Sequence, residues 1–223
     1  MADKIPQKAK SSISKATLPA NKVAYVIGGG PSLKGFDFSQ LRGRPCYAAN
    51  KSAFFVPWGF LISTDRDFCL NCVPEIEDFG ERAFLSPPEN MHERMKLPYA
   101  RNANYLRREK CQKVFDMEDG TLAGLNSGAA AFAKALFDGY KNIALLGIDM
   151  LPKVGHFHDG YKWNPHGIND GIIGAWISQF EVAAEEAKKR GGYRIINFSP
   201  DSAVQGFEKR PLSELETAFK DAP

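Results

Sequence analysis

The sequence predicts an α/β protein with a Rossmann-like, mostly parallel sheet and helices on both faces of that sheet. Residues 23–27 read Val-Ala-Tyr-Val-Ile, a continuous apolar run that three glycines end, and such a run is typical of a strand buried on both faces. Helical patterns lie between the later apolar runs, and strands that alternate with helices form parallel sheets. The further predicted strands are at 45–49, 58–63, 82–85, 142–147 and 193–198.

Two helices are predicted together with the residues that begin them. An alanine-rich segment covers 125–140 and offers Asn126 or Ser127 as its N-cap. A second segment carries apolar residues on one face, offers Asn169 or Asp170 as its N-cap and ends in Lys-Lys-Arg-Gly. Both have the length of helices that connect parallel strands.

The composition is that of a soluble globular protein. The 223 residues are 43% hydrophobic and 25% charged, with a net charge of +3. No apolar run approaches the ~18 residues that a membrane span needs, and four cysteines are few for a disulfide scaffold. We therefore expect a cytoplasmic protein with no membrane span. The charge is compatible with nucleic acid but does not indicate it, and a homo-oligomer is expected only as a common state of such proteins.

A glycine loop follows the first predicted strand. Glycine lets the backbone approach a ligand, and N–H groups of such a turn can face phosphate. The loop is not G-x-G-x-x-G, and the second strand is followed by Asn50 and Lys51 where a dinucleotide site needs an acid. A dinucleotide is therefore disfavoured, and a tight turn without a ligand is the alternative. The residues of this glycine loop are Gly28, Gly29, Gly30, Pro31 and Ser32.

Polar residues also follow other predicted strands, and open α/β sheets bind ligands where their parallel strands end. Asp65 would bind a sugar hydroxyl or a metal, or would cap the next helix. The helix start at Asn126 would stabilise an anion, act only as a cap, or do both. The candidate nucleotide-binding residues beyond the glycine loop are Asn50, Lys51, Thr64, Asp65, Asn126, Ser127, Gly128, Asp149 and Met150.

A histidine-rich segment follows the strand at 142–147. Three of the four histidines, His156, His158 and His166, lie within eleven residues of one another. Histidine changes its charge near neutral pH and is a natural general base or metal ligand, although histidines in loops are often only solvated. The alternative metal ligands are Asp65, Asp149, His156 and His158.

Several short segments occur in an order known from one family. These segments are 27–34, 36–39, 49–51, 126–128 and 139–149. Together they resemble the bacterial lipooligosaccharide sialyltransferases, and the glycine loop with the strand pattern also resembles the archaeal 6-hydroxymethylpterin pyrophosphokinase-like family. The pattern extends over most of the chain after the basic N-terminal segment, and it consists of short motifs.

The sialyltransferase resemblance implies a nucleotide domain that uses a cytidine monophosphate (CMP) sugar without an essential metal. The glycine loop, Asn50 and residues 126–128 would contact the nucleotide, and Asp149 would lie near its ribose or base. His166 would take the proton of the acceptor hydroxyl as that hydroxyl attacks the anomeric carbon. Tyr161 would donate to the departing phosphate.

Three functions fit this sequence. The first is a glycosyltransferase-like enzyme that needs no cofactor and transfers a sugar from a nucleotide-activated donor to a hydroxyl acceptor. The second is a magnesium-dependent phosphoryl or pyrophosphoryl transferase of the pterin pyrophosphokinase-like type, with Asp65 and Asp149 supporting the metal. The third is a non-catalytic nucleotide-binding protein. In each case we expect a basic flexible tail at 1–22 and one Rossmann-like domain at 23–223, whose loop-rich lid comes from 86–112 and 150–169.

Overall fold

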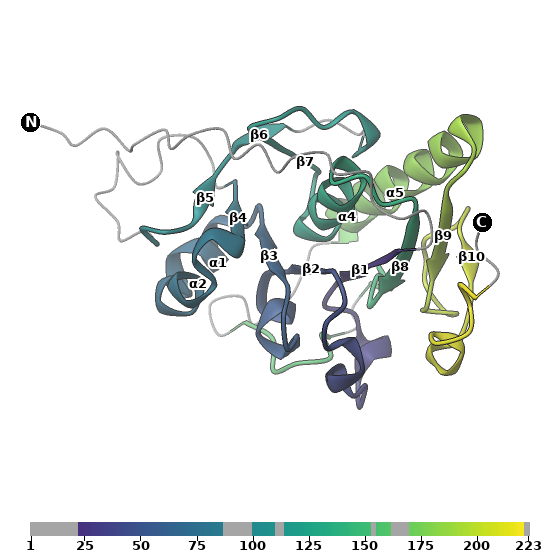
Figure 1. Cartoon of the computed structure of the whole chain (residues 1–223), viewed down its shortest axis with the longest axis horizontal. Coiled ribbons are helices and arrows are strands. Elements are labelled where there is room, and N and C mark those ends of the chain that lie inside the picture. Colours follow the sequence, from purple (N-terminus) through teal and green to yellow (C-terminus); the bar gives the residue numbers. More distant parts are fainter. Residues whose placement is uncertain (1–21, 87–99, 110–113, 153–154, 162–169, 221–223) are drawn as a thin grey trace, which may run out of the picture.

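The structure is a computed structural model of the chain that describes residues 22–86, 100–109, 114–152, 155–161 and 170–220 (Figure 1). His166, the base that the resemblance implies, lies outside these described residues. The predicted cap Asn169 and residues 1–21 of the predicted tail lie outside them as well.

One parallel sheet of eight strands runs through the described part of the chain, in the order β10-β9-β8-β1-β2-β3-β4-β5. The Rossmann-like prediction is therefore confirmed. The strands are β1 (Val23–Ile27), β2 (Cys46–Ala49), β3 (Phe60–Ser63), β4 (Ala83–Leu85), β5 (Asn104–Tyr105), β8 (Asn142–Leu146), β9 (Arg194–Asn197) and β10 (Glu208–Lys209). All six strands that the apolar runs predicted are present.

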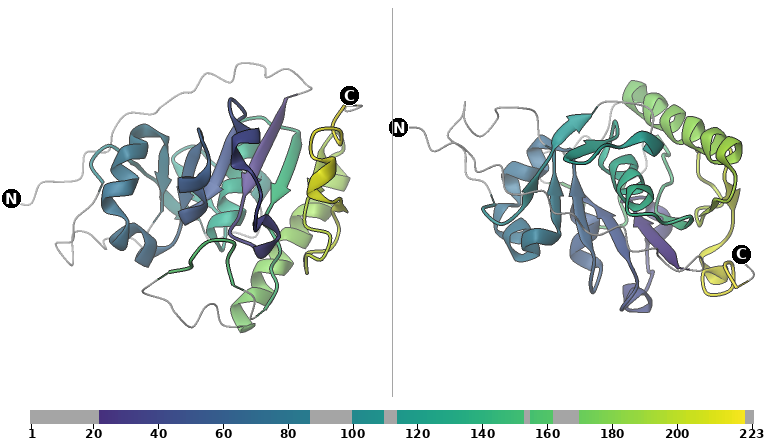
Figure 2. Two further views of the ribbon diagram at one scale, coloured as in Figure 1. Left: turned by 90° about the horizontal axis from the view of Figure 1, so that it is seen from below. Right: turned by 45° about the horizontal axis from the view of Figure 1, so that its top comes forward.

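Helices cover both faces of this sheet (Figures 1 and 2). The α-helices are α1 (Arg66–Asn71), α2 (Val73–Phe79), α4 (Ser127–Phe137) and α5 (Asp170–Arg190). The short 3₁₀ helices are η1 (Pro31–Leu33), η2 (Phe38–Leu41), η3 (Asn50–Phe55), η4 (Gly80–Arg82), η5 (Val114–Asp116) and η6 (Leu212–Glu214). Both predicted long helices are present, and Asn126 is the N-cap of α4.

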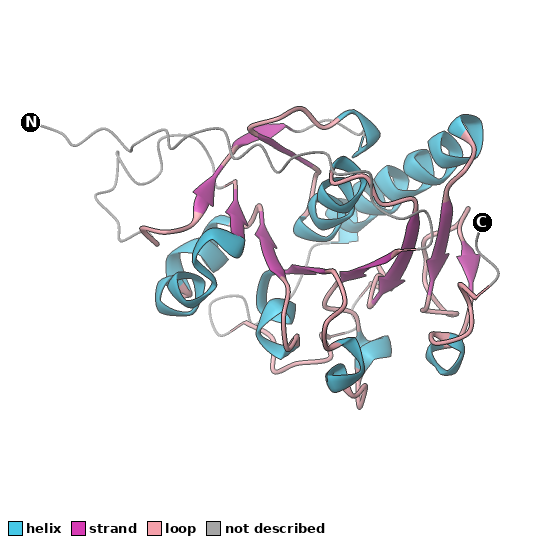
Figure 3. Cartoon of the chain, viewed as in Figure 1, coloured by secondary structure: helices cyan, strands magenta, loops and turns pink. Residues whose placement is uncertain are grey.

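The alternation of side chains along β1 divides the core into two layers. Ala24 and Val26 belong to the apolar cluster that includes α4 and α5, whereas Tyr25 and Ile27 belong to the cluster that includes α1, α2 and the 3₁₀ helices η1 to η3. The strands form a single row between these two layers (Figure 3). Because β1 is buried on both faces, it reads as a continuous apolar run.

The strand order reverses beside β1. The chain passes from β1 through β2, β3 and β4 on one side, and β8 lies on the other side of β1. The carboxyl ends of these strands share one edge of the sheet, which we call the carboxyl edge. In open α/β sheets the reversal point at that edge is where ligands bind.

The shortest elements differ from the prediction. A second parallel pair, β6 (Arg107–Glu109) with β7 (Thr121–Ala123), was not predicted because three residues are too few for a periodic pattern. Near the end of the described chain the structure shows only η6 followed by turns. Among the described residues, no helix combines the length and the apolar character needed to cross a bilayer.

Candidate functional site

The glycine loop lies against the segment that follows β8. A β-carbon on Gly28 would clash with the carbonyl oxygen of Gly147, and one on Gly30 would clash with the carboxylate of Asp149. A β-carbon on Gly29 would lie 2.6 Å from Nδ1 of His156. Other segments of the same chain therefore occupy the space that side chains at these three positions would need, and only glycine fits there.

Most N–H groups of this loop have partners within the protein. Gly28 donates to the end of β8 at 2.8 Å, and Gly30 donates to the carbonyl oxygen of Gly147 at 2.9 Å. The N–H of Ser32 donates to Oδ2 of Asp149 at 2.9 Å. The expectation that these N–H groups face phosphate is thus wrong for these three positions, because the loop after β8 already accepts their hydrogen bonds.

The start of α4 lies beside the same two segments. The Cδ1 atom of Ile148 is 2.7 Å from the place of a β-carbon on Gly28 and 3.3 Å from the place of one on Gly128. Oδ1 of Asn126 caps the helix by accepting from the N–H of Ala129 at 3.0 Å. The structure therefore brings the glycine loop, the start of α4 and the segment after β8 together around Ile148.

The residues after β2 hold Tyr161 in place. Its hydroxyl oxygen accepts hydrogen bonds from the Asn50 side chain and from the backbone N–H of Lys51. The Lys51 ammonium donates to the carbonyl oxygen of Gly160 at 2.7 Å. Burial raises the pKa of Tyr161 well above its ordinary value and outweighs both hydrogen bonds, so the hydroxyl keeps its proton at neutral pH.

Two of the predicted histidines lie over the glycine loop. The rings of His156 and His158 are stacked, with centroids 4.8 Å apart and an angle of 7° between their planes. Nδ1 of His156 is 3.2 Å from the carbonyl oxygen of Gly29, and the N–H of Phe157 donates to the same oxygen at 3.1 Å. Burial lowers the pKa of both imidazoles, to about 4 for His158, so both are neutral at pH 7.

Thr64 and Asp65 follow β3 and have structural partners. The N–H of Thr64 donates to the hydroxyl of Ser127 at 3.0 Å, which ties the end of β3 to the start of α4. Oδ1 of Asp65 accepts from the N–H groups of Asp67 and Phe68 at 2.8 and 3.0 Å and caps α1. Of the two roles left open for Asp65, the structure shows the helix cap.

Arg108 of β6 also reaches this edge, although the sequence did not single it out. Its guanidinium donates to the carbonyl oxygens of Thr64 at 3.0 Å and Leu125 at 3.1 Å. Burial lowers the pKa of Arg108, and the nearby carboxylate of Asp65 opposes that shift. Arg108 stands beside another arginine in a basic stretch, so only the fold distinguishes it from its neighbours.

Six buried polar side-chain atoms have no hydrogen-bond partner within the described part of the chain, and all six belong to residues of this region. Buried polar groups are nearly always bonded, so such atoms need an explanation. The six atoms are Oδ1 of Asn50, Nε of Arg108, Nδ2 of Asn126, Oδ1 of Asp149, Nε2 of His158 and Oδ1 of Asn197.

Asn197, which ends β9, was not predicted as a site residue. Its Nδ2 donates to the carbonyl oxygen of Ile148 at 3.2 Å.

Two residues after strands of this edge have strained backbones. Asn50 has a φ of 52° and Met150 a φ of 51°, and these are the non-glycine residues with positive φ among those described. Asparagine tolerates this left-handed conformation, whereas an unbranched apolar residue rarely adopts it. Such strain costs about 1–3 kcal/mol and is concentrated at functional sites.

The proposed metal ligands are not assembled into a metal site. Asp65 caps α1, Asp149 accepts from Ser32, and the two histidines stack beside Gly29. Within the ranges that the structure describes, no three His, Cys, Asp or Glu side chains form a group that could hold a metal ion. The described residues thus show no assembled group of ligands at Asp65, Asp149, His156 and His158, and the alternative of a metal at these residues stays a prediction.

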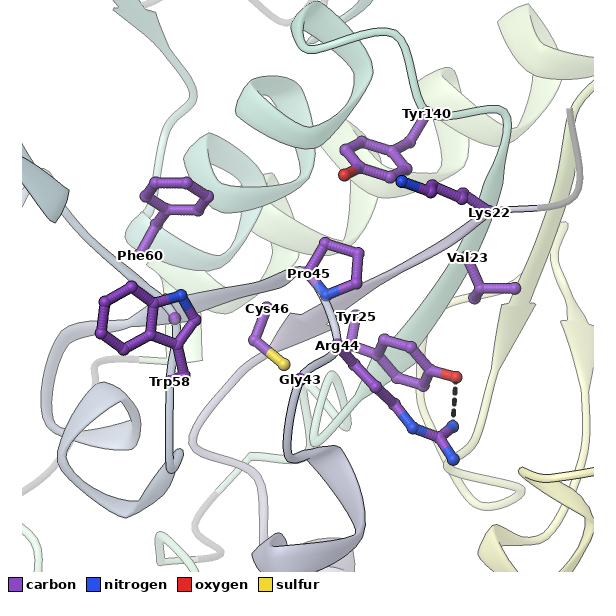
Figure 4. Close-up of a pocket in the computed structure, with 11 residues that line it drawn as sticks. Lys22, Val23, Tyr25, Gly43, Arg44, Pro45, Cys46, Trp58, Phe60 and Tyr140 are labelled. Carbon is purple, nitrogen blue, oxygen red and sulfur yellow. Dashed lines mark hydrogen bonds between the residues drawn. The ribbon is translucent and has the colours of Figure 1, made fainter. Parts of the chain in front are cut away.

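A cavity of about 540 Å³ lies at the opposite, amino-terminal edge of the sheet, where β1, β2 and β3 begin. Trp58 and Phe60 line one side, Tyr140 and Lys22 lie across from them, and Arg44 donates to the hydroxyl of Tyr25 (Figure 4). None of the predicted site residues lines this cavity. We favour the carboxyl edge as the functional site, because the unpartnered polar atoms and the strained residues lie there.

The chain resembles one solved glycosyltransferase in fold. The structure of MAf glycosyltransferase from Magnetospirillum magneticum AMB-1 is similar with a TM-score of 0.55 and 16% sequence identity, over 90% of this chain. The match covers 35% of that protein, so this chain spans about a third of its length. No protein-family model and no curated protein matches the sequence.

Proposed function

We propose that the protein is a glycosyltransferase-like enzyme that binds a nucleotide-activated sugar at the carboxyl edge and transfers the sugar to a hydroxyl acceptor. The observation that carries this proposal is the set of six unpartnered buried polar atoms at the edge where open α/β sheets bind ligands. The fold of the similar MAf glycosyltransferase supports this class of reaction. CMP is the nucleotide that the family resemblance implies.

The N–H of Ser32 in the glycine loop is not available to the donor phosphate, because Asp149 already accepts its hydrogen bond. The phosphate therefore needs positive charge from side chains. Arg108, with its unpartnered Nε, and Lys51, which lies beside Tyr161, supply that charge. The unpartnered oxygens of Asp149 and Asn197 suit the hydroxyl groups of a ribose or the amino group of a base.

The acceptor hydroxyl must lose its proton as it attacks the anomeric carbon. Three histidines are candidates for this base, and two of them, His156 and His158, lie beside the glycine loop. Tyr161 keeps its proton and is therefore able to donate to the departing phosphate.

Calorimetric titration tests this proposal against its alternatives. CMP, cytidine diphosphate and cytidine triphosphate are titrated with and without magnesium, followed by the corresponding uridine, guanosine and adenosine nucleotides. We expect binding of a mono- or diphosphate without metal, and transfer from the matching nucleotide sugar. Binding only of a triphosphate with magnesium would instead indicate phosphoryl or pyrophosphoryl transfer, and absence of any binding would contradict all nucleotide-based functions.

An asparagine variant locates the nucleotide. Asn50→Ala should weaken binding by about 1–3 kcal/mol, or about 5- to 150-fold, because it removes a buried hydrogen-bonding group. The matched control is Asn71→Ala on the exposed side of α1, where the amide donates only to the carbonyl oxygen of Asp67. Equal affinity of both variants for the nucleotide would remove Asn50 from the site.

A further inference from the structure

The two stacked imidazoles have different partners at the same ring nitrogen. Nδ1 of His156 faces the carbonyl oxygen of Gly29 at 3.2 Å, and a carbonyl oxygen only accepts hydrogen bonds. Nδ1 of His158 faces the backbone N–H of Gly160 at 3.1 Å, and that N–H only donates. A neutral imidazole carries one proton, so its partner at Nδ1 decides which nitrogen carries it.

The consequences for the two Nε2 atoms are opposite. In His156 the proton is on Nδ1, which leaves a lone pair on Nε2. In His158 the lone pair of Nδ1 is used by Gly160, which leaves the proton on Nε2. This Nε2 is a buried atom with no hydrogen-bond partner among the described residues, so it is a donor without an acceptor in the free protein.

We propose that this pair divides the chemistry of sugar transfer: Nε2 of His156 is the general base for the acceptor hydroxyl, and the Nε2–H group of His158 binds a phosphate oxygen of the donor. The inference rests on the proposed glycosyltransferase function and names the residues that act in it. His156 is then a catalytic residue in place of His166.

The step balances with these two residues and no other reactant. The acceptor oxygen forms a bond to the anomeric carbon while the bond from that carbon to the phosphate oxygen breaks. The electron pair of the broken bond stays on the nucleotide phosphate, which gains one negative charge and is stabilised by the hydrogen bond from His158. The proton of the acceptor hydroxyl moves to Nε2 of His156 and is then released to water.

The surroundings keep both rings neutral before this step. Burial lowers the pKa of His158 most, the neighbouring imidazole and Lys51 lower it further, and Asp159 opposes them more weakly. The ring of Tyr161 meets both imidazoles edge-on, with centroids 5.2 Å from His156 and 5.5 Å from His158. The ring of Phe55 also stacks with that of His158, with centroids 6.0 Å apart. Stacking and burial thus fix the ring planes, and the backbone partners fix the tautomers.

Nuclear magnetic resonance of the full chain tests the tautomers without any substrate. Long-range ¹H–¹⁵N spectra of protein labelled with ¹⁵N-histidine identify the protonated nitrogen of each ring, and His156→Asn and His158→Gln assign the signals. We expect the Nδ1–H form for His156 and the Nε2–H form for His158 at pH 7. The same tautomer in both rings would overturn the inference, whether or not the protein transfers sugar.

Kinetics test the two roles separately. His156→Asn keeps a donor for the carbonyl oxygen of Gly29 but has no base, so kcat should fall about 100- to 10,000-fold while nucleotide affinity is retained, and free imidazole should restore part of the rate. His158→Leu should weaken nucleotide binding about 10-fold or more, and His158→Gln, which keeps an N–H donor, should weaken it less.

His166, the third histidine of the histidine-rich segment, provides the decisive comparison. If His166→Asn abolishes transfer and His156→Asn does not, the base is His166 and the inference is wrong. If the unmodified protein transfers no sugar from any nucleotide donor, the proposed function fails, and the tautomers measured by NMR still show whether the structural part of the inference holds.

Discussion

Asp149→Asn should make the protein more stable and less able to bind its nucleotide. The side chain of Asp149 is 3% exposed; Oδ2 accepts from Ser32, and Oδ1 has no partner among the described residues. Leaving a buried polar atom unpaired costs about 1–3 kcal/mol, and more for a charged group. Asparagine keeps the hydrogen bond to Ser32 and removes the charge.

We therefore expect the free energy of unfolding to rise by about 1–2 kcal/mol, which corresponds to a Tm increase of about 2–8 °C for a chain of this length. Nucleotide affinity should fall about 10- to 150-fold, because a hydrogen bond to a charged group contributes about 1.5–3 kcal/mol. Urea denaturation and scanning calorimetry measure the first effect, and titration calorimetry measures the second.

The matched control is Asp37→Asn, which removes the same charge from an exposed residue. Oδ1 of Asp37 caps η2 by accepting from the N–H of Ser39 at 2.9 Å, and asparagine forms the same cap. Stability and affinity should both remain close to those of the parent. Destabilisation of Asp149→Asn by more than about 1 kcal/mol would mean that the carboxylate is satisfied in the free protein. Unchanged affinity would exclude Asp149 from the binding site.

Two other results are expected from the same region. Gly28→Ala should lower the free energy of unfolding by about 1–3 kcal/mol in urea denaturation, because its β-carbon would clash with the backbone of Gly147. The control is Gly174→Ala on α5, where a β-carbon meets no atom within 4 Å, and it should stabilise the helix by about 1 kcal/mol. Equal effects of the two substitutions would refute the packing argument. Stability should also fall as the pH drops from about 6.5 to about 4, because the pKa of His158 is about 4 in the folded protein against 6.5 for an ordinary histidine, so the unfolded chain binds more protons in this window. The loss attributable to His158 should be about 1–3 kcal/mol, because part of the ring is exposed to water, and an unchanged pH dependence in His158→Gln would show that other groups cause it.

The elements that the sequence predicted carry strong local signals. β1 is buried on both faces and therefore contains only apolar residues. The start of α4 is marked by Asn126, whose cap bond reaches a residue only three positions away. By contrast, β5 and β10 have two residues each, and β6 reads Arg-Arg-Glu, so neither length nor periodicity distinguishes them from loops.

Part of the candidate site was also predicted from local sequence signals. Parallel strands end at one edge, so the glycine loop, Asn50 and Asp149 could be placed together from the strand pattern alone. Arg108 and Asn197 could not, because nothing in their neighbouring residues distinguishes them from other polar side chains. Their positions depend on β6 reaching the end of β3 and on β9 pairing with β8.

The sequence by itself determined the fold class and the edge of the sheet where polar residues gather, because periodicity, caps and glycine turns are properties of neighbouring residues. Only the tertiary structure decided what each of those residues does. Ser32 and Asp149 are 117 positions apart, and His156 is 127 positions from Gly29. The hydrogen bonds between them determine which backbone donors and acceptors are occupied. Partners so distant in the chain meet only when the sheet places β8 beside β1.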